Sequence, residues 1–321
     1  MQGFSKETTA CLLRSIESPT LCAYLRAWKT FADWCHQQKV YYSTLSIRDV
    51  CAFLVFLFKK GHTVSFLNIV RSGLSFFLCH LFVVGENLKV KRLFRFFWKR
   101  RPKFPRYLVT WDICKVLRFL SSWHPINQLS FKQLTLKTVT LVAITSSDRA
   151  QTLESIDIEF SEITNEGIYF PIYSLLKTSK RNRPVRVVRC VRFDEPSLDI
   201  CNYVVAYLQR SLKYRIKAVR QGHPKPRNLF LSYYSGKPLK RATIAKYITD
   251  VLSLAGINTK CFKAHTTRGA LPSVMSRSSS PEQILNQGDW TNLGTFKRFY
   301  ERYQNNSVEG RLIQRITGLR N

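Results

Sequence analysis

The second half of the chain carries four short stretches whose side chains could together cleave a phosphodiester bond. They are Ser146-Ser147-Asp148-Arg149, Leu176-Lys177-Thr178-Ser179-Lys180, Ala264-His265-Thr266-Thr267-Arg268-Gly269, and a C-terminal stretch that contains Trp290 and Tyr300. Cleavage without a metal needs a nucleophile, guanidinium groups that stabilise charge on the non-bridging oxygens, and an acid for the leaving oxygen. The planar fork of arginine binds two phosphate oxygens at once. A tyrosine nucleophile would keep the energy of the broken bond in a phosphotyrosyl ester, so the cleavage could be reversed.

Two of these positions have a competitor nearby. Lys177 and Lys180 both suit the tip of a predicted hairpin, and Lys177 is favoured because it directly follows an apolar strand. Tyr300 and Tyr303 lie three residues apart, so on the helix expected there they would share one face. Both tyrosines are candidate nucleophiles.

No metal and no cofactor are expected. Asp157 and Glu159 are close in sequence, but alternate residues of a strand do not by themselves form a two-metal site. The nine cysteines contain no pair with the short spacing of a zinc knuckle. Most of them lie in apolar stretches, so they are expected to be buried free thiols in a reducing compartment.

Composition and charge point to a folded protein with a polyanionic partner. Lys and Arg number 51 against 20 Asp and Glu, which gives a net charge of +31, yet 45% of the residues are apolar and 13% are aromatic. A disordered basic tail would be poor in aromatic residues. Because so much positive charge repels itself, a nucleic acid is the first candidate partner and an anionic membrane surface the second.

Membrane-spanning and secreted proteins are not expected. No apolar run approaches the roughly 20 residues that a spanning helix needs, and the first ten residues show no secretory signal.

A basic stretch divides the chain. Residues 89–106 hold nine basic residues and no acidic one, and Pro102 and Pro105 favour an extended linker at 101–107. The predicted domains are therefore 1–100 and 108–321, and the two sides of this linker are both strongly basic, which suggests a clamp around a DNA duplex. The candidate DNA contacts are Lys99, Arg100, Arg101, Lys103, Arg106, Lys180 and Arg181.

The periodicity of apolar residues predicts helices, then a small antiparallel sheet, then helices. The spacing predicts helices near 18–35, 50–58, 63–82 and 87–98, and in the second domain near 110–120, 130–145, 198–218, 241–254, 271–276 and 295–303. Strands are expected at 156–160, 168–176 and 185–193. The fold class is thus mainly α, with an all-helical first domain and a mixed α+β second domain.

The order of these motifs resembles the tyrosine recombinase family, also called phage-integrase-like enzymes. The resemblance rests on Arg149, a hairpin lysine, His265-x-x-Arg268, Trp290 and Tyr300 in that order, and it covers nearly the whole chain. It implies a helical core-binding domain followed by a catalytic domain. The Thr-Phe-Lys-Arg-Phe-Tyr ending looks most like the recombinases of eukaryotic mobile elements, the DIRS, Ngaro and Crypton types.

The resemblance implies a role for each of these residues. Arg149 and Arg268 would clamp the scissile phosphate, and Lys177 would protonate the leaving 5′ oxygen. His265 would act as an acid/base or phosphate ligand, Trp290 would donate its indole N–H to the phosphate, and Tyr300 would form the 3′-phosphotyrosyl bond. Tyr300 lies ten residues after Trp290, where related enzymes often have nine, and Tyr303 lies further out still.

The implied function is site-specific DNA recombination or integration through a 3′-phosphotyrosyl intermediate, without metal or ATP. Double-stranded DNA would be the partner, the active assembly would be a homo-tetramer, and no membrane or small-molecule cofactor would take part. Alternatives are a type IB topoisomerase, an inactive domesticated descendant that only binds DNA, and a basic membrane-surface protein. Lys99-Arg100-Arg101 could also be a nuclear localisation signal, so the protein would be nuclear if eukaryotic and otherwise cytoplasmic.

Two positions depart from the family pattern. The acidic residue often found three positions after the first arginine is Thr152 here, with Glu154 nearby. Pro272 lies four residues after Arg268, and it fits the expected helix only if that helix starts late.

Overall fold

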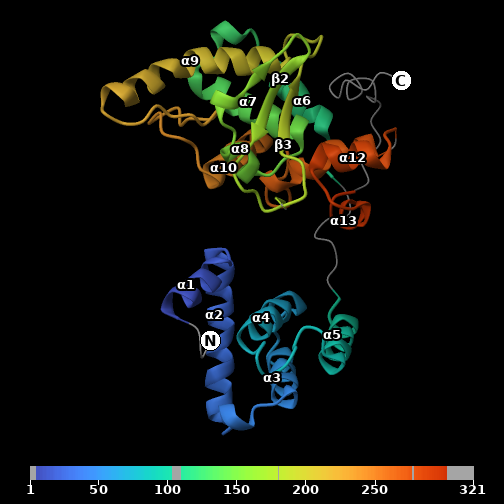
Figure 1. Ribbon diagram of the computed structural model, residues 1–321. Helices are drawn as coiled ribbons and strands as arrows, with labels where there is room; N and C mark the ends of the chain where they lie inside the picture. Colours follow the sequence, from blue (N-terminus) through green and yellow to red (C-terminus); the bar gives the residue numbers. More distant parts are fainter. Residues whose placement is uncertain (1–4, 103–109, 180, 277, 302–321) are drawn as a thin grey trace. The chain divides into compact units, whose positions relative to one another are not determined.

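The computed structural model describes residues 5–102, 110–179, 181–276 and 278–301 (Figure 1). The chain divides into two compact units, Met1–Phe104 and Pro105–Asn321, and each is described by itself. The candidates Lys103, Arg106, Lys180 and Tyr303 lie outside the described residues, as does most of the expected linker. The domain boundaries drawn from the sequence therefore stay a prediction.

Helices build the described part of the first unit. They are α1 (Lys6–Arg14), α2 (Ser18–Gln37), α3 (Ile47–Lys59), α4 (Val64–Phe77) and α5 (Leu88–Arg100). Ser46 and Asp49 form a capping box at the start of α3, where the backbone N–H of Ser46 donates to Oδ2 of Asp49 at 2.9 Å. The core is rich in aromatic rings, and the buried Phe31 and Phe53 meet edge-on with centroids 5.0 Å apart.

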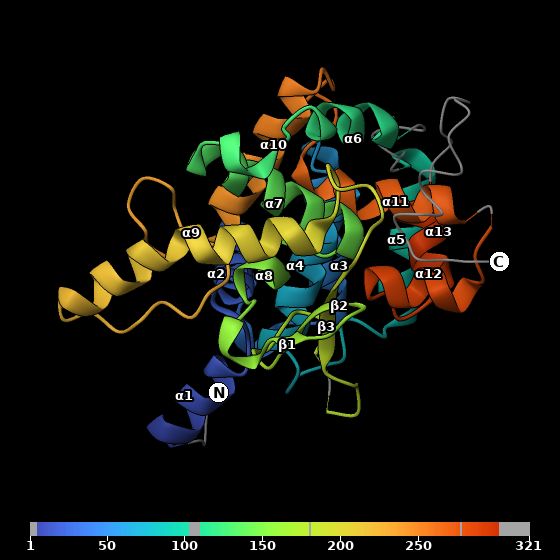
Figure 2. The same cartoon turned by 90° about the horizontal axis from the view of Figure 1, so that it is seen from above.

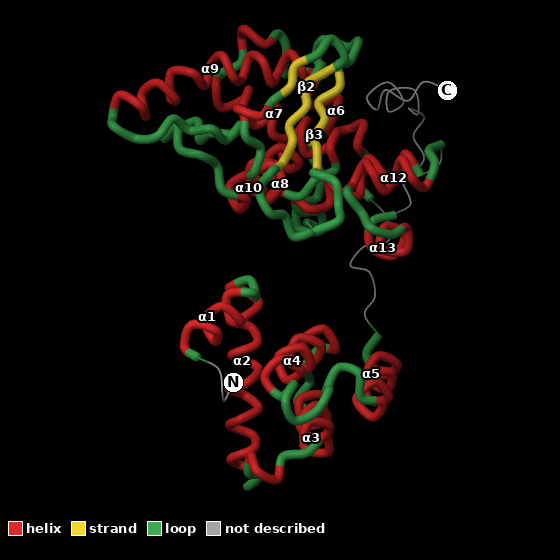
Figure 3. Tube along the Cα trace, viewed as in Figure 1, coloured by secondary structure: helices red, strands yellow, loops and turns green. Residues whose placement is uncertain are grey.

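The second unit contains a three-stranded antiparallel sheet (strands yellow in Figure 3), and helices cover one face of it. Its helices are α6 (Ile113–Ser121), α7 (Phe131–Ser146), α8 (Ala150–Glu154), α9 (Ile200–Arg220), α10 (Arg241–Leu254), α11 (Thr267–Met275), α12 (Pro281–Gly288) and α13 (Leu293–Phe299), and its strands are β1 (Glu162–Ile163), β2 (Gly167–Ile172) and β3 (Arg186–Val191). Short 3-10 turns cover Ile126–Gln128, Ile158–Phe160 and Ala264–Thr266. This arrangement confirms the predicted fold class.

Alternate residues of β2 and β3 are apolar and buried, so one face of the sheet is covered. Ile168, Phe170 and Ile172 of β2 are buried, and Val188 and Cys190 of β3 are buried beside them in the antiparallel register. This apolar face joins the main core of the unit, and α7 contacts both β3 and α9 (Figures 1 and 2).

Helix α7 is enclosed on nearly all sides, including its polar residues. The hydroxyls of the buried Thr135, Thr138 and Thr140 each donate to the carbonyl four residues earlier, at 2.7–2.8 Å. Lys137 is fully buried, and its Nζ donates to the carbonyls of Trp123 and Ser197, both at 2.7 Å. The helix therefore buries its polar groups with partners, and it ends at the segment that carries Arg149.

Three expected elements differ from the structure, and some helices were not predicted. The strand expected at 156–160 contains the 3-10 turn Ile158–Phe160, and β1 follows it. Helix α11 begins at Thr267 rather than at 271, so Pro272 lies inside it. Helix α13 ends at Phe299, before both candidate tyrosines, and the helices α1, α8 and α12 were not expected.

Most of the cysteines are more exposed than the sequence predicts. All nine cysteines are free, but only Cys114, Cys190 and Cys201 are buried, so the expectation of buried thiols is wrong for most of them. Among the described residues, no helix has the length and apolar character needed to cross a membrane.

Candidate active site

The guanidinium of Arg268 lies at the centre of the candidate site. Arg268 stands in the first turn of α11 and is 3% exposed. Its Cζ lies 4.8 Å from the ring centroid of Trp290 and 5.3 Å from that of Tyr300. Nη2 donates to the carbonyl of Gly288, whereas the buried Nε and Nη1 have no hydrogen-bond partner among the described residues. Two strong donors therefore remain for an anion.

Burial and the positive charge of Arg149 lower the pKa of Arg268 to about 10. The guanidinium is still cationic at neutral pH. The effect of Arg149 also indicates that the two predicted phosphate-binding arginines are close enough to repel each other. A phosphate between them would relieve that repulsion.

Trp290 adds a third donor to the same cluster. Its ring packs against Phe296 and Tyr300, each with centroids 5.0 Å away, and its buried Nε1 has no hydrogen-bond partner in the described part of the chain. Gly288 permits this placement, because a Cβ at that position would overlap the Trp290 ring. The side chain is thus held by packing while its N–H stays available.

Tyr300 lies directly after α13, not on it. Its carbonyl accepts a hydrogen bond from Oγ of Ser273 at 2.8 Å, which ties the tyrosine to α11. Gly269 allows the approach, since a Cβ there would lie 3.0 Å from the Tyr300 carbonyl oxygen. The predicted shared helical face of Tyr300 and Tyr303 is not formed by α13, because the helix ends at Phe299.

Arg149 is presented by a tight turn at the end of α7. Ser147 adopts a left-handed conformation with φ of 54°, and Arg149 is the N-cap residue of α8. The preceding Asp148 is buried, and its carboxylate pairs with Arg186 of β3 at 2.9 Å. The turn is therefore fixed from the sheet side, and Arg149 itself stays half-buried.

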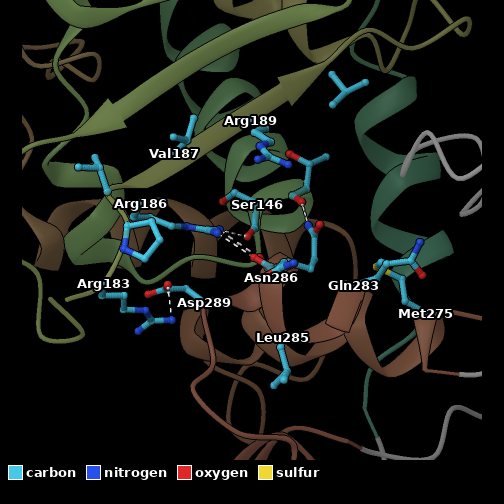
Figure 4. A pocket seen from close by; sticks show the side chains of 15 residues that line it. Ser146, Arg183, Arg186, Val187, Arg189, Met275, Gln283, Leu285, Asn286 and Asp289 are labelled. Carbon is cyan, nitrogen blue, oxygen red and sulfur yellow. Dashed lines mark hydrogen bonds and ion pairs between the residues drawn. The ribbon is translucent and has the colours of Figure 1, made fainter. Parts of the chain in front are cut away.

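Arg186 also reaches the end of α12, as Figure 4 shows. Its Nη1 donates to the carbonyl of Asn286 at 2.8 Å, and its Nη2 donates to the carbonyls of Gln287 and Ser146 at 3.1 and 3.2 Å. A cavity of about 540 Å³ lies along these contacts, lined by residues of β3 and α12. One side chain thus holds together the sheet, the Arg149 turn and the segment that leads to Trp290.

Lys177 lies on the connection between β2 and β3, and it is exposed. The next residue, Thr178, donates from Oγ1 to Oδ2 of Asp289 at 2.7 Å, and Asp289 precedes Trp290. The contact brings the backbone beside Lys177 to the Trp290 segment. Arg181 is exposed on the same connection, and the choice between Lys177 and Lys180 stays open.

His265 lies in the 3-10 turn before α11 and is exposed. The next residue anchors this turn, because Nε1 of Trp111 donates to Oγ1 of Thr266 at 2.8 Å. The three-residue spacing to Arg268 places both residues at the start of one short segment.

Asp157 and Glu159, which were not expected to form a metal site, both pair with Arg227. Nε of Arg227 lies 2.9 Å from an oxygen of Asp157 and 2.6 Å from one of Glu159. Within the described ranges, no group of three or more His, Cys, Asp or Glu residues is placed to hold a metal ion.

Of the DNA contacts predicted in the first unit, Lys99 and Arg100 are exposed in the last turn of α5. Arg101 is engaged in the fold, since its Nη1 donates to the carbonyl of His62 at 3.1 Å and its Cζ lies 4.0 Å from the centroid of Phe58. Arg101 is therefore less available to a phosphate than its two neighbours.

Sequence reasoning missed the residues that support the site. Asp148, Arg186 and Asp289 were not proposed as functional. Part of the signal was present, because Asp148 and Asp289 each directly precede a predicted site residue in a chain with only 20 acidic residues. Their partners come from the β2–β3 connection and β3, so the pairing itself depends on the fold.

Comparisons with known proteins concern the fold of the chain. No family model and no curated protein matches the sequence. A lambda integrase dimer bound to a COC′ core site has a TM-score of 0.55 at 13% identity, over 92% of this chain and 94% of that one. XerH site-specific recombinase bound to palindromic difH substrate gives 0.61 at 13% identity, over 88% and 76%. A lambda integrase tetramer bound to a Holliday junction gives 0.52 at 12% identity, over 92% and 75%. The chain therefore has the fold of the tyrosine recombinases and integrases, as its motif order predicted, and the mobile-element subtype stays a prediction.

Proposed function

We propose that the protein is a site-specific DNA recombinase that cleaves and rejoins DNA through Tyr300. One observation carries the proposal. Three buried N–H donors, from Nε and Nη1 of Arg268 and Nε1 of Trp290, have no partner among the described residues, and both side chains contact the Tyr300 ring. Buried donors without partners are costly unless a ligand satisfies them. A phosphate next to the tyrosine would do so.

In the proposed reaction, Oη of Tyr300 attacks the phosphorus and the bond from phosphorus to the 5′ oxygen breaks. His265 takes the tyrosine proton, and Lys177 gives a proton to the leaving 5′ oxygen. Arg149, Arg268 and the indole N–H of Trp290 stabilise the charge that grows on the non-bridging oxygens. Attack by a free 5′ hydroxyl on the phosphotyrosine reverses these steps and restores the tyrosine.

The proposed partner is duplex DNA, and the proposed assembly is a tetramer on two paired sites. Both units are strongly basic, and the structural neighbours are described as bound to DNA, one of them as a tetramer on a Holliday junction. The mobile-element origin and the nuclear location rest on the sequence alone.

The test recovers the target sequence together with the activity. The protein is incubated with a library of randomised duplexes, denatured in detergent, and the covalently attached DNA is recovered and sequenced. We expect a defined sequence to be enriched, and we expect Tyr300→Phe to abolish the adduct. Tyr234→Phe is the matched control, because Tyr234 is a strongly exposed tyrosine of the same unit.

Other outcomes point to the alternatives. An adduct that survives in Tyr300→Phe but not in Tyr303→Phe makes Tyr303 the nucleophile. Relaxation of supercoiled plasmid without exchange between two labelled sites favours a type IB topoisomerase. Sequence-selective binding without any adduct favours an inactive DNA-binding descendant.

A further inference from the structure

Asp289 links the β2–β3 connection to the centre of the site. Its Oδ2 accepts the hydrogen bond from Oγ1 of Thr178 at 2.7 Å. Its Oδ1 lies 2.8 Å from Nη2 of Arg183, as Figure 4 shows. Its side chain is 12% exposed, and that of Arg183 is 22% exposed. This carboxylate therefore binds the connection at two points, Thr178 and Arg183.

The backbone conformation of Asp289 is unusual and suits an aspartate. Asp289 is the C-cap residue of α12 and adopts a left-handed conformation with φ of 54°. Asp and Asn tolerate that conformation better than most residues. Its neighbours on either side are Gly288, whose carbonyl accepts from Arg268, and Trp290, whose ring packs on Tyr300. The carboxylate is thus held beside the phosphate-binding donors.

Among the described residues, the connection has few other contacts with the rest of the unit. The Tyr173 ring packs edge-on against Phe160. The hydrogen bonds from the Leu176 N–H to Oγ of Ser179 and from Nη1 of Arg183 to the Thr178 carbonyl lie within the connection. Between the end of β2 and the start of β3, Tyr173, Leu175 and Lys177 are exposed, and Leu175 is 87% exposed. Leu176 is the one apolar side chain in the described part of this connection that is buried. Apolar packing alone would leave the segment around Lys177 free to move relative to the site.

We infer that Asp289 is a positioning residue that holds the β2–β3 connection so that Lys177 can reach the leaving 5′ oxygen. The inference rests on the proposed function. A general acid must come within hydrogen-bond distance of the atom that it protonates, and a displacement of about 1 Å can lower the rate about 10²-fold. Asp289 would act only through Lys177 and would not touch the DNA.

The test separates positioning of the acid from general damage to the site. Two near-isosteric changes weaken the link from opposite ends: Asp289→Asn removes the charge that pairs with Arg183, and Thr178→Val removes the hydroxyl donor. Single-turnover adduct formation is measured on the recovered DNA sequence and on the same sequence with sulfur in place of the bridging 5′ oxygen. A thiolate leaves without being protonated, so the sulfur substrate does not need the acid.

On the oxygen substrate we expect both variants to form the adduct about 10–100-fold more slowly. On the sulfur substrate we expect them to match the wild-type protein, as Lys177→Ala should. Asp157→Asn is the control, because Asp157 forms a 2.9 Å ion pair with Arg227 elsewhere in the same unit. It should behave as wild type on both substrates.

Each failure has its own signature. If the wild-type protein forms no adduct on either substrate, the proposed function fails. If the wild-type protein cleaves both substrates but the variants cleave the oxygen substrate at the wild-type rate, Asp289 does not position the acid. The inference also fails if the variants stay equally slow on the sulfur substrate, because the defect then lies elsewhere in the site.

Discussion

The carboxylate of Asp148 accepts two hydrogen bonds from the guanidinium of Arg186, at 3.2 Å from Nε and 2.9 Å from Nη2. The side chain of Asp148 is 1% exposed and that of Arg186 is 16% exposed. Asp148 directly precedes Arg149, so this buried pair fixes the turn that presents one of the two predicted phosphate-binding arginines. A buried carboxylate is tolerated here because it has a bidentate partner.

Replacing Arg186 should therefore destabilise the second unit strongly. Arg186→Met leaves Asp148 buried without its cation, and we expect the free energy of unfolding to fall by about 3–5 kcal/mol. Urea unfolding measures the change. Arg189→Met is the control on the same strand, where the side chain is exposed, and it should change the value by about 0.5 kcal/mol or less. An equal loss in both variants would mean that the Asp148 pair contributes nothing special.

Arg268 should show the opposite behaviour, although it too is a buried arginine. It has two donors without partners in the described structure, so Arg268→Met removes a buried charge whose hydrogen bonds are only partly satisfied. We expect this variant to be as stable as the wild-type protein or up to about 3 kcal/mol more stable, and to form no DNA adduct. A buried group that costs stability and is required for activity is typical of a functional site.

Sulfate provides an independent measure of the same anion site. Sulfate binding should raise the melting temperature of the wild-type protein more than that of Arg268→Met, because a ligand that binds only the folded state stabilises it. Arg189→Met loses the same charge on the surface and should keep the wild-type response. An identical sulfate response in wild type and Arg268→Met would contradict the phosphate site.

Lys137 should make the stability of the second unit depend on pH. Burial lowers the pKa of Lys137 from its ordinary value of 10.5 to about 7 in the folded protein. Between these two values the unfolded chain binds more protons than the folded one, so stability contributed through this group rises with pH. Relative to Lys137→Met, the free energy of unfolding should rise by about 2 kcal/mol from pH 7 to pH 9.

Unfolding in urea at several pH values measures this difference. Lys132→Met is the control, because Lys132 lies on the same helix and is exposed. Its free energy of unfolding should follow that of the wild-type protein across the range. A wild-type curve parallel to that of Lys137→Met would show that the buried amine does not titrate in this window.

The first unit should contribute to DNA affinity through the end of α5. Lys99→Ala combined with Arg100→Ala should lower the slope of log affinity against log salt by about 2, since each lost phosphate contact changes it by about 0.9. Filter binding or fluorescence anisotropy at several salt concentrations gives the slope. Arg14→Ala with Lys29→Ala removes the same charge from exposed positions of α1 and α2. Equal slopes for the two double variants would argue against a specific role for α5.

Much of the fold could be predicted because its signals are local. The capping box at Ser46 and Asp49 identifies the start of α3, and the helix predicted at 241–254 coincides with α10. Helix α12 was missed although Ser280, Pro281 and Gln283 form a capping box with proline in the first turn. That helix could have been found from the sequence.

The remaining errors come from contacts between distant segments. In the segment expected to be a strand at 156–160, the side chain of Asp157 accepts a hydrogen bond from the backbone N–H of Glu159. This local hydrogen bond competes with strand pairing. At Tyr300, the carbonyl accepts from Ser273 of α11, a tertiary contact at the end of α13 that its own residues do not encode. The supporting pairs of Asp148 and Asp289 depend on the same kind of long-range contact, so motif spacing could identify the predicted phosphate ligands but not what holds them.

Two residues of the candidate site, Arg149 and Lys177, are supported in different ways. Arg149 follows a helix that is enclosed on nearly all sides, so its position is set when the core forms. Lys177 lies on the β2–β3 connection, which is held by the carboxylate of Asp289 and the hydroxyl of Thr178. Either contact can be removed by a single substitution. The position of Arg149 thus depends on the folded core, whereas the connection that carries Lys177 can be loosened while the core stays intact.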